Sequence, residues 1–300
     1  MKTLLVLCLL FSQQALSKLK VVTSTTNLKA LVNEVGRDKV EVSSFSKGSQ
    51  DPHFLEAKPS FMVKASQADL LVQIGLGLEE GWLPLIIRGA RNPKIRPGEK
   101  GHFFASVGVD LLEVSDEVVT RAKGDVHPEG NPHFMLDPIR ASVVAEKLAK
   151  KLSSLDSKNT DFYFENAKSF KKEMLKIVNA GKRILTNKNK KIITYHKTLN
   201  YFNERFSLKN LAYLEPKPGV PPTASHIIKV IKIAKNELPK HILIENYFDP
   251  SVGKRVINGL KKSELHIVPV AVEGRRDINN LKDLYISLLK TVADEEVWKY

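Results

Sequence analysis

Short apolar runs alternate with amphipathic segments along the first part of the chain. Residues 18–25, 40–45 and 69–74 are rich in β-branched and aliphatic residues and have the length of buried strands. Residues 26–35 and 60–68 place their apolar side chains three and four positions apart, as one face of a helix does. Strands and helices that alternate in this way predict a mostly parallel sheet with helices on both faces.

The same alternation returns in the last third of the chain. Predicted strands occupy residues 191–195, 211–214, 241–245 and 266–272, and predicted helices occupy residues 225–236, 249–260 and 281–290. The pattern therefore predicts a second α/β lobe with the architecture of the first.

A long helical stretch separates the two predicted lobes. After a polar turn at residues 156–160, its apolar stripe consists of Phe162, Phe164, Ala167, Phe170, Met174, Ile177 and Ile184. A helix over residues 160–185 would be roughly 35–40 Å long at about 1.5 Å per residue, which is longer than a small domain needs. We interpret it as a rigid connector between the lobes, the alternative being an ordinary long surface helix.

These patterns divide the chain into a signal peptide (1–17), an N-terminal α/β lobe (18–158), a connecting helix (159–187) and a C-terminal α/β lobe (188–300). In the signal peptide Lys2 supplies the positive charge, and residues 4–11 form an apolar core too short to span a bilayer. The single cysteine, Cys8, lies inside that core and not at the cleavage point of a lipoprotein signal. We expect an exported protein without a lipid anchor, whose mature chain has no disulfide and no thiolate metal ligand.

The charge of the chain is strongly basic. It has 47 Lys and Arg residues against 33 Asp and Glu, a formal charge of +14, and losing Lys2 with the signal peptide would leave 14 − 1 = +13. The lysines are spread over helical segments and are not interleaved with aromatic residues, so nucleic acid is not the expected partner. A solvated basic surface that is attracted to an anionic membrane face explains the charge better.

Three histidines occupy one type of position. His53 and His133 each follow a proline in a turn, and His196 follows the predicted strand 191–195. Asp137 and Pro138 then have the sequence of a helix start, with Asp137 as the N-cap. Each histidine alone would also fit an ordinary surface turn. All three are expected at the carboxyl ends of strands, where α/β folds bind ligands, and neutral imidazoles suit Zn²⁺ or another divalent transition metal.

These motifs together resemble the solute-binding proteins that deliver Zn²⁺ or Mn²⁺ to ABC transporters, the cluster A-I or ZnuA/TroA-like family. The resemblance covers essentially the whole mature chain and rests on Asp51-Pro52-His53 with Lys58-Pro59-Ser60, on Gly130 to Pro138, on Thr194-Tyr195-His196 with Tyr201-Phe202, and on Glu215 to Gly219 with Pro221-Pro222. It implies two α/β lobes joined by one long helix, with the metal in the cleft between them. His53 and His133 would come from the first lobe and His196 from the second.

The resemblance also implies a function: a periplasmic, monomeric binding protein that captures the metal and delivers it to the permease of an ABC transporter at the inner membrane. Manganese-binding members often have glutamate at the position of His196, so the histidine favours zinc over manganese. The family commonly supplies an aspartate as fourth ligand after the last strand, where this chain has Glu273 and Asp277. We favour Glu245 as the fourth ligand, with Glu273, Asp277 or water as alternatives; Glu245 could instead orient a ligand histidine.

Two other classes of function remain open. A three-histidine site with a free fourth position also describes a zinc hydrolase, although the chain has no His-Glu-x-x-His pair and no His-x-His-x-Asp-His cluster. A surface adhesin is disfavoured by the expected lack of a lipid anchor. We therefore expect a binding protein and not an enzyme. The role of His127, in the polar loop 116–131, stays unassigned.

Overall fold

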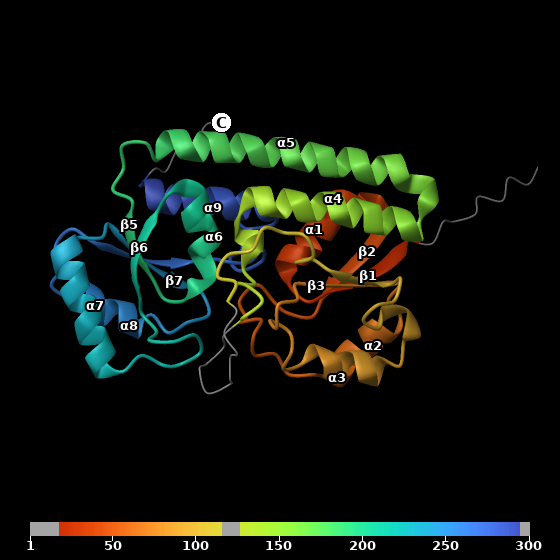
Figure 1. Ribbon diagram of the computed structural model, residues 1–300, viewed down its shortest axis with the longest axis horizontal. Helices are drawn as coiled ribbons and strands as arrows, with labels where there is room; N and C mark the ends of the chain where they lie inside the picture. Colours follow the sequence, from red (N-terminus) through yellow and green to blue (C-terminus); the bar gives the residue numbers. More distant parts are fainter. Residues whose placement is uncertain (1–17, 116–126, 295–300) are drawn as a thin grey trace, which may run out of the picture.

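The computed structural model describes residues 18–115 and 127–294, so the predicted signal peptide and residues 116–126 of the polar loop lie outside the described residues. Each of the two lobes contains a four-stranded sheet (Figure 1). The first sheet has the order β2 (Val40–Ser44), β1 (Leu19–Thr23), β3 (Leu70–Gln73), β4 (His102–Phe104). The second has the order β6 (Lys209–Tyr213), β5 (Lys191–Thr194), β7 (His241–Glu245), β8 (Glu264–Val268).

All neighbouring strands of both sheets run parallel, as the alternation of strands and helices predicts. The helices are α1 (Thr26–Gly36), α2 (Pro59–Ser66), α3 (Leu83–Ala90), α4 (Pro138–Leu155), α5 (Thr160–Ile184), α6 (Asn200–Phe206), α7 (Ala224–Glu237), α8 (Ser251–Ile257) and α9 (Leu281–Ala293). Figure 1 shows α2 and α3 on the outer side of the first sheet and α7 and α8 at the far end of the second lobe. The fold class is therefore confirmed.

The connecting helix α5 runs along one side of both lobes (Figure 1). Its buried stripe contains Tyr163, Ala167, Phe170 and Met174, which are three or four residues apart. Phe164, which we expected in this stripe, is 44% exposed. The reason is helical geometry: Tyr163 keeps the spacing to Ala167 and Phe170, whereas Phe164 points away from it.

The two lobes are also held together directly. One hydrophobic core runs through both lobes beneath α5. The hydroxyl of Thr26 donates to the carbonyl of Val272 (2.7 Å), and the hydroxyl of Tyr285 donates to the carbonyl of Met135 (2.7 Å). A Cβ at Gly48 would lie 2.3 Å from the backbone of residues 273–274, so glycine permits loops of the two lobes to touch. Large hinge opening would break these contacts.

One strand lies elsewhere than expected, and one strand was not predicted. The last strand, expected at 266–272, is β8 at Glu264–Val268, because the backbone of residues 270–272 bonds to the first lobe and not to the sheet. We did not predict β4 (His102–Phe104), whose three residues carry too little pattern.

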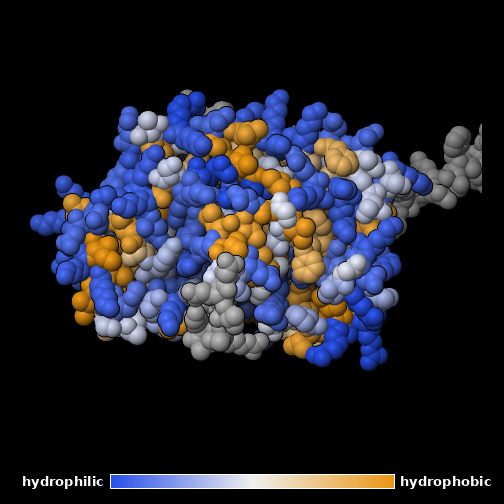
Figure 2. Space-filling model, in the orientation of Figure 1, coloured by the Kyte–Doolittle hydropathy of each residue, from blue (hydrophilic) through white to orange (hydrophobic). Residues whose placement is uncertain are grey.

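The visible surface is mostly hydrophilic (Figure 2). On the face shown in Figure 2, hydrophilic side chains cover most of the surface and hydrophobic ones gather in separate patches. No helix among residues 18–115 and 127–294 is long and apolar enough to cross a membrane.

Candidate metal centre

The structure brings His53, His133 and His196 together between the lobes. His53 lies in the loop after β2, His133 immediately before the turn of 3-10 helix that leads to α4, and His196 two residues after β5. One ring nitrogen of each lies within 4.8 Å of the other two. The ring centroids are separated by 5.2 Å (His53–His133), 5.3 Å (His133–His196) and 5.6 Å (His53–His196).

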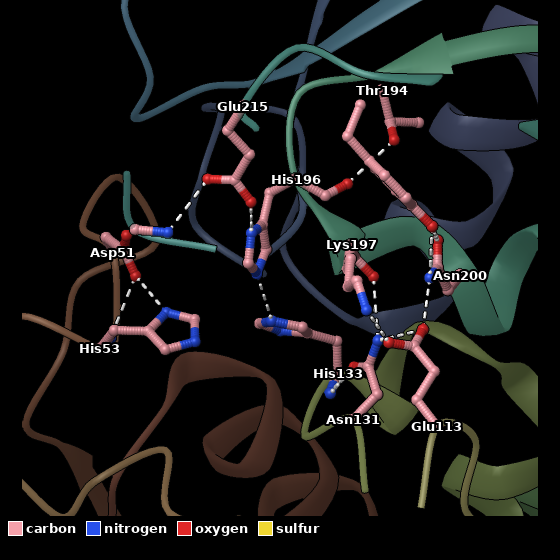
Figure 3. A network of polar contacts seen from close by, with 12 residues as sticks. Asp51, His53, Glu113, Asn131, His133, Thr194, His196, Lys197, Asn200 and Glu215 are labelled. Atoms are coloured by element: carbon pink, nitrogen blue, oxygen red, sulfur yellow. Dashed lines mark hydrogen bonds and ion pairs between the residues drawn. The ribbon is translucent and has the colours of Figure 1, made fainter. Parts of the chain in front are cut away.

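The spacing of these nitrogens fits one small divalent ion. Zn–N bonds of about 2.0–2.1 Å at tetrahedral angles put neighbouring nitrogens roughly 3.3–3.4 Å apart. The Nε2 atoms of His133 and His196 are 3.3 Å apart and point toward each other (Figure 3). The Nε2 atom of His53 is buried and has no hydrogen-bond partner within the described residues. Its lone pair is therefore available to a metal ion.

A carboxylate orients two of the three rings. Asp51 accepts from both the backbone N–H and the ring Nδ1 of His53, at 3.0 and 2.6 Å. Glu215 accepts from Nδ1 of His196 and, through its other oxygen, from the backbone N–H of Gly219 (3.1 Å). Because Nδ1 of each ring donates to a carboxylate, the proton lies on Nδ1 and Nε2 has a free lone pair. Each Nε2 presents this lone pair to the centre, the arrangement found around ligating histidines (Figure 3).

The ring of His133 is fixed through its backbone. Its N–H donates to the side chain of Asn131 (2.9 Å), and Asn131 in turn donates to the carbonyl of Lys197 in the second lobe (3.1 Å). Burial lowers the pKa of His133 well below its usual value, and the nearby His53 and His196 rings lower it further. His133 is therefore a neutral base at neutral pH, which is the form that binds metal.

Glu245 stands at the end of β7 and is fully buried. Burial raises the pKa of its carboxyl group to about 8, and neither oxygen has a hydrogen-bond partner among residues 18–115 and 127–294. It does not belong to the group of ligand atoms that lie within 4.8 Å of one another. Its role as fourth ligand stays a prediction.

The other two carboxylate candidates already have partners. Glu273 accepts from Nζ of Lys29 at 2.8 Å, and its side chain is 49% exposed. Asp277 binds the guanidinium of Arg275 with both oxygens, at 2.6 and 2.7 Å. Neither belongs to the three-histidine group in the described structure. Either would have to break an ion pair to reach a metal.

His127, in the polar loop, lies beside the metal centre. Its Nδ1 donates to the carbonyl of Leu76 (2.7 Å), and its ring centroid is 5.4 Å from that of His53. Its Nε2 is buried without a hydrogen-bond partner in the described part of the chain. Burial, then the charge of His53, lowers the pKa of His127 to about 4. It thus offers a fourth neutral imidazole beside His53.

Comparison with known proteins identifies the family of the chain. Residues 21–295 match the family model described as "Zinc-uptake complex component A periplasmic". The chain is 27% identical over 252 residues to the manganese ABC transporter substrate-binding lipoprotein PsaA of Streptococcus pneumoniae, covering 82% of this chain and 77% of that protein. It is 24% identical over 294 residues to the iron ABC transporter substrate-binding lipoprotein MtsA of Streptococcus pyogenes serotype M1, covering 93% and 87%.

Among solved structures, a crystal structure of ZnuA superposes with a TM-score of 0.79 at 22% identity, covering 94% of this chain and all of that one. This likeness confirms the fold of two lobes and one connecting helix. The two curated relatives are named lipoproteins, which differs from our expectation of no lipid anchor. That expectation rests on Cys8, outside the described residues.

Proposed function

Because this chain belongs to the family of periplasmic zinc-uptake components, we propose that it captures a divalent transition metal outside the cytoplasm and delivers it to the permease of an ABC importer. The observation that carries the proposal is the convergence of three buried or half-buried imidazoles from two lobes, each with a ring nitrogen within 4.8 Å of the others. We further propose that the protein acts in the periplasm as a monomer and docks on the permease at the inner membrane.

Zinc is the metal that we propose, with manganese as the alternative. Relatives are named for manganese and for iron, so the family does not settle the metal. The donor set favours zinc: imidazole nitrogen suits Zn²⁺, whereas Mn²⁺ prefers carboxylate and water oxygens and binds a given site less tightly. With His53, His133 and His196, the proposed site includes Glu245 as fourth donor.

The test is elemental analysis of protein purified from its native compartment, together with a titration of metal-free protein. We expect about one equivalent of zinc in the purified protein and tight uptake of one zinc ion in the titration. Protein loaded with manganese or iron would overturn the zinc proposal. Turnover of an ester, phosphoester or lactam by the zinc form would instead support a hydrolase.

Capture requires little movement of the lobes in this structure. His53 and His133 come from the first lobe and already lie beside each other, so His196 completes the site from the second lobe. The continuous hydrogen bonding of α5 and the bonds of Thr26 and Tyr285 across the interface resist large bending. Release would follow when docking on the permease separates His196 from the other two.

We therefore expect metal-free and zinc-bound protein to have nearly the same radius of gyration in solution X-ray scattering. We predict that hydrogen exchange slows mainly in loops 116–131 and 270–277, the loops that we expect to rearrange when the metal binds. A large contraction on adding zinc would contradict a rigid connector and favour hinge closure.

Replacing Glu245 with glutamine should weaken zinc binding by about tenfold or more, because the amide cannot make the bond to the ion that we propose for the carboxylate, while the side-chain volume stays. His127→Gln should cost less than about threefold if its ring only lines the site. Glu273→Gln is the matched control, since its carboxylate pairs with Lys29 and is half-exposed. Competition with a chelator of known affinity measures all three. A loss in His127→Gln and none in Glu245→Gln would move the fourth donor to His127.

A further inference from the structure

A second group of potential ligands lies at the opposite end of the second sheet. β7 begins at His241 and β8 begins at Glu264, whereas β7 ends at Glu245, toward the three-histidine site. In the parallel pairing of these strands His241 is the partner of Glu264, and His266 follows Glu264 by two residues. Side chains two residues apart on a strand point to the same face. Strand register thus brings His241, Glu264 and His266 together.

The three ligand atoms already have nearly the spacing of a metal site. Nδ1 of His241 lies 3.1 Å from Nε2 of His266, and Oε2 of Glu264 lies 3.5 Å from the same Nε2. All three atoms lie within 4.8 Å of one another. A tetrahedral zinc ion, with bonds of about 2.0–2.2 Å to nitrogen and oxygen, sets such separations at roughly 3.3–3.5 Å. The two separations that involve His266 already lie near this range, and the ligand atoms of His241 and Glu264 lie within 4.8 Å of each other.

A hydrogen bond between the two rings accounts for only part of this arrangement. Burial, as the main cause, lowers the pKa of both His241 and His266, so both rings are neutral at neutral pH. Only one proton can then lie between the two facing nitrogens. Nε2 of His266 is engaged with the ring of His241, so it cannot also satisfy Oε2 of Glu264, which lies beside it. A divalent cation would satisfy all three lone pairs at once.

Access and charge also suit a cation. His241 is buried, but the side chains of His266 and Glu264 are 27% and 48% exposed, so an ion can enter and keep a water ligand. Lys240, the nearby positive charge, binds Glu264 and lies 3.2 Å from a carboxylate oxygen of Asp294. Two carboxylates thus face one ammonium group.

We propose that His241, Glu264 and His266 form a second site for a borderline divalent transition ion such as Zn²⁺, weaker than the three-histidine site and separate from it. The weaker binding follows from its exposed carboxylate and from the competition of Lys240 for that carboxylate. This inference does not depend on the proposed function, because it uses none of the residues of the first site.

The test is a calorimetric zinc titration of untagged, full-length protein. The parent should bind two zinc ions with clearly different affinities. His266→Ala should keep the tight ion and lose the weak one, whereas His196→Ala should keep the weak one. Glu264→Gln, an exposed change that leaves the core intact, should weaken the second ion by about tenfold or more. His226→Ala is the matched control, since the His226 ring bonds the carbonyl of Tyr213, away from both sites, and its loss should leave both ions in place.

Binding of a single zinc ion by the parent that His266→Ala retains would overturn the second site. So would a weak ion that survives both His266→Ala and Glu264→Gln. If the parent bound one zinc ion that His266→Ala loses and His196→Ala keeps, the proposed function would be contradicted and this inference would stand. Cobalt gives an independent readout, because tetrahedral Co²⁺ absorbs visible light. In the His196→Ala variant only the second site should bind cobalt, so adding His266→Ala should remove the remaining absorption. In the parent, His266→Ala should leave the absorption of the first site.

Discussion

Replacing His196 with alanine is expected to weaken zinc binding by at least about 100-fold. His196 supplies the imidazole that reaches the centre from the second lobe, and its Nε2 faces that of His133 at 3.3 Å. Losing groups that merely orient a ligand costs about 10–100-fold in metal affinity, so losing a ligand should cost at least as much. The measurement is competition with a chelator of known affinity.

The fold of the His196→Ala variant needs its own control. The ligand side chains do not lie on the surface, since His133 and His196 are 9% and 5% exposed. Removing the His196 ring would also leave one oxygen of the buried Glu215 carboxylate without its imidazole partner. Metal-free parent and variant should therefore be compared by thermal melting. Glu215→Gln keeps the ring and should cost less affinity than His196→Ala.

Thermal melting also reports binding itself. A ligand that binds only the folded state at 100 times its Kd adds about 2.7 kcal/mol of stability. Zinc should raise the melting temperature of the parent strongly and that of His196→Ala much less. If the variant bound zinc as tightly as the parent, His196 would not be a ligand.

Local patterns were enough to single out the three histidines as ligand candidates. Proline turns mark His53 and His133, and a strand end marks His196; each signal lies within a few residues of the histidine itself. The helix start at Asp137 was predicted in the same way and is confirmed, since Asp137 accepts from the backbone N–H of Ile139. Strand alternation was likewise enough for the fold of the two lobes.

The partners of these histidines depend on tertiary structure, and the sequence did not reveal them. Glu215 belongs to a recognised motif, but its contact with His196 arises because β6 lies beside β5 in the sheet. His127 lies beside His53 because its ring bonds the carbonyl of Leu76, 51 residues away along the chain. The His241–His266 pair requires the register of β7 and β8. Such neighbours follow from strand order, which hydrophobic periodicity does not specify.

The contacts that hold the lobes in place were missed for the same reason, and Asp137 is the clearest case. Its carboxylate is fully buried and caps α4. It also accepts from Nη1 of Arg140 (2.9 Å) and from Nε and Nη2 of Arg205 (2.8 and 2.7 Å). Arg205 belongs to α6 of the second lobe, the helix that follows His196. Asp137 thus links the segment after His133 to the segment after His196.

Asp137→Ala is therefore expected to lower the free energy of unfolding by about 3 kcal/mol or more. Removing one partner of a buried ion pair costs about 3–5 kcal/mol, and losing a helix cap costs about 1 kcal/mol. We place the expected loss at the lower end because the side chain of Arg205 is 25% exposed and stays partly solvated. Urea unfolding of the metal-free protein measures the loss.

Two matched variants separate the causes of this destabilisation. Asp137→Asn keeps an oxygen for the cap but loses the charge, so its free energy of unfolding should lie between those of the parent and of Asp137→Ala. Asp110→Asn removes a carboxylate that also pairs with Arg140, at 3.3 Å, but is 94% exposed, so it should cost less than about 0.5 kcal/mol. Equal losses in Asp137→Ala and Asp110→Asn would show that burial of the ion pair does not matter. A loosened Asp137→Asn protein should also bind zinc more weakly, because His196 would no longer be held in register with His133.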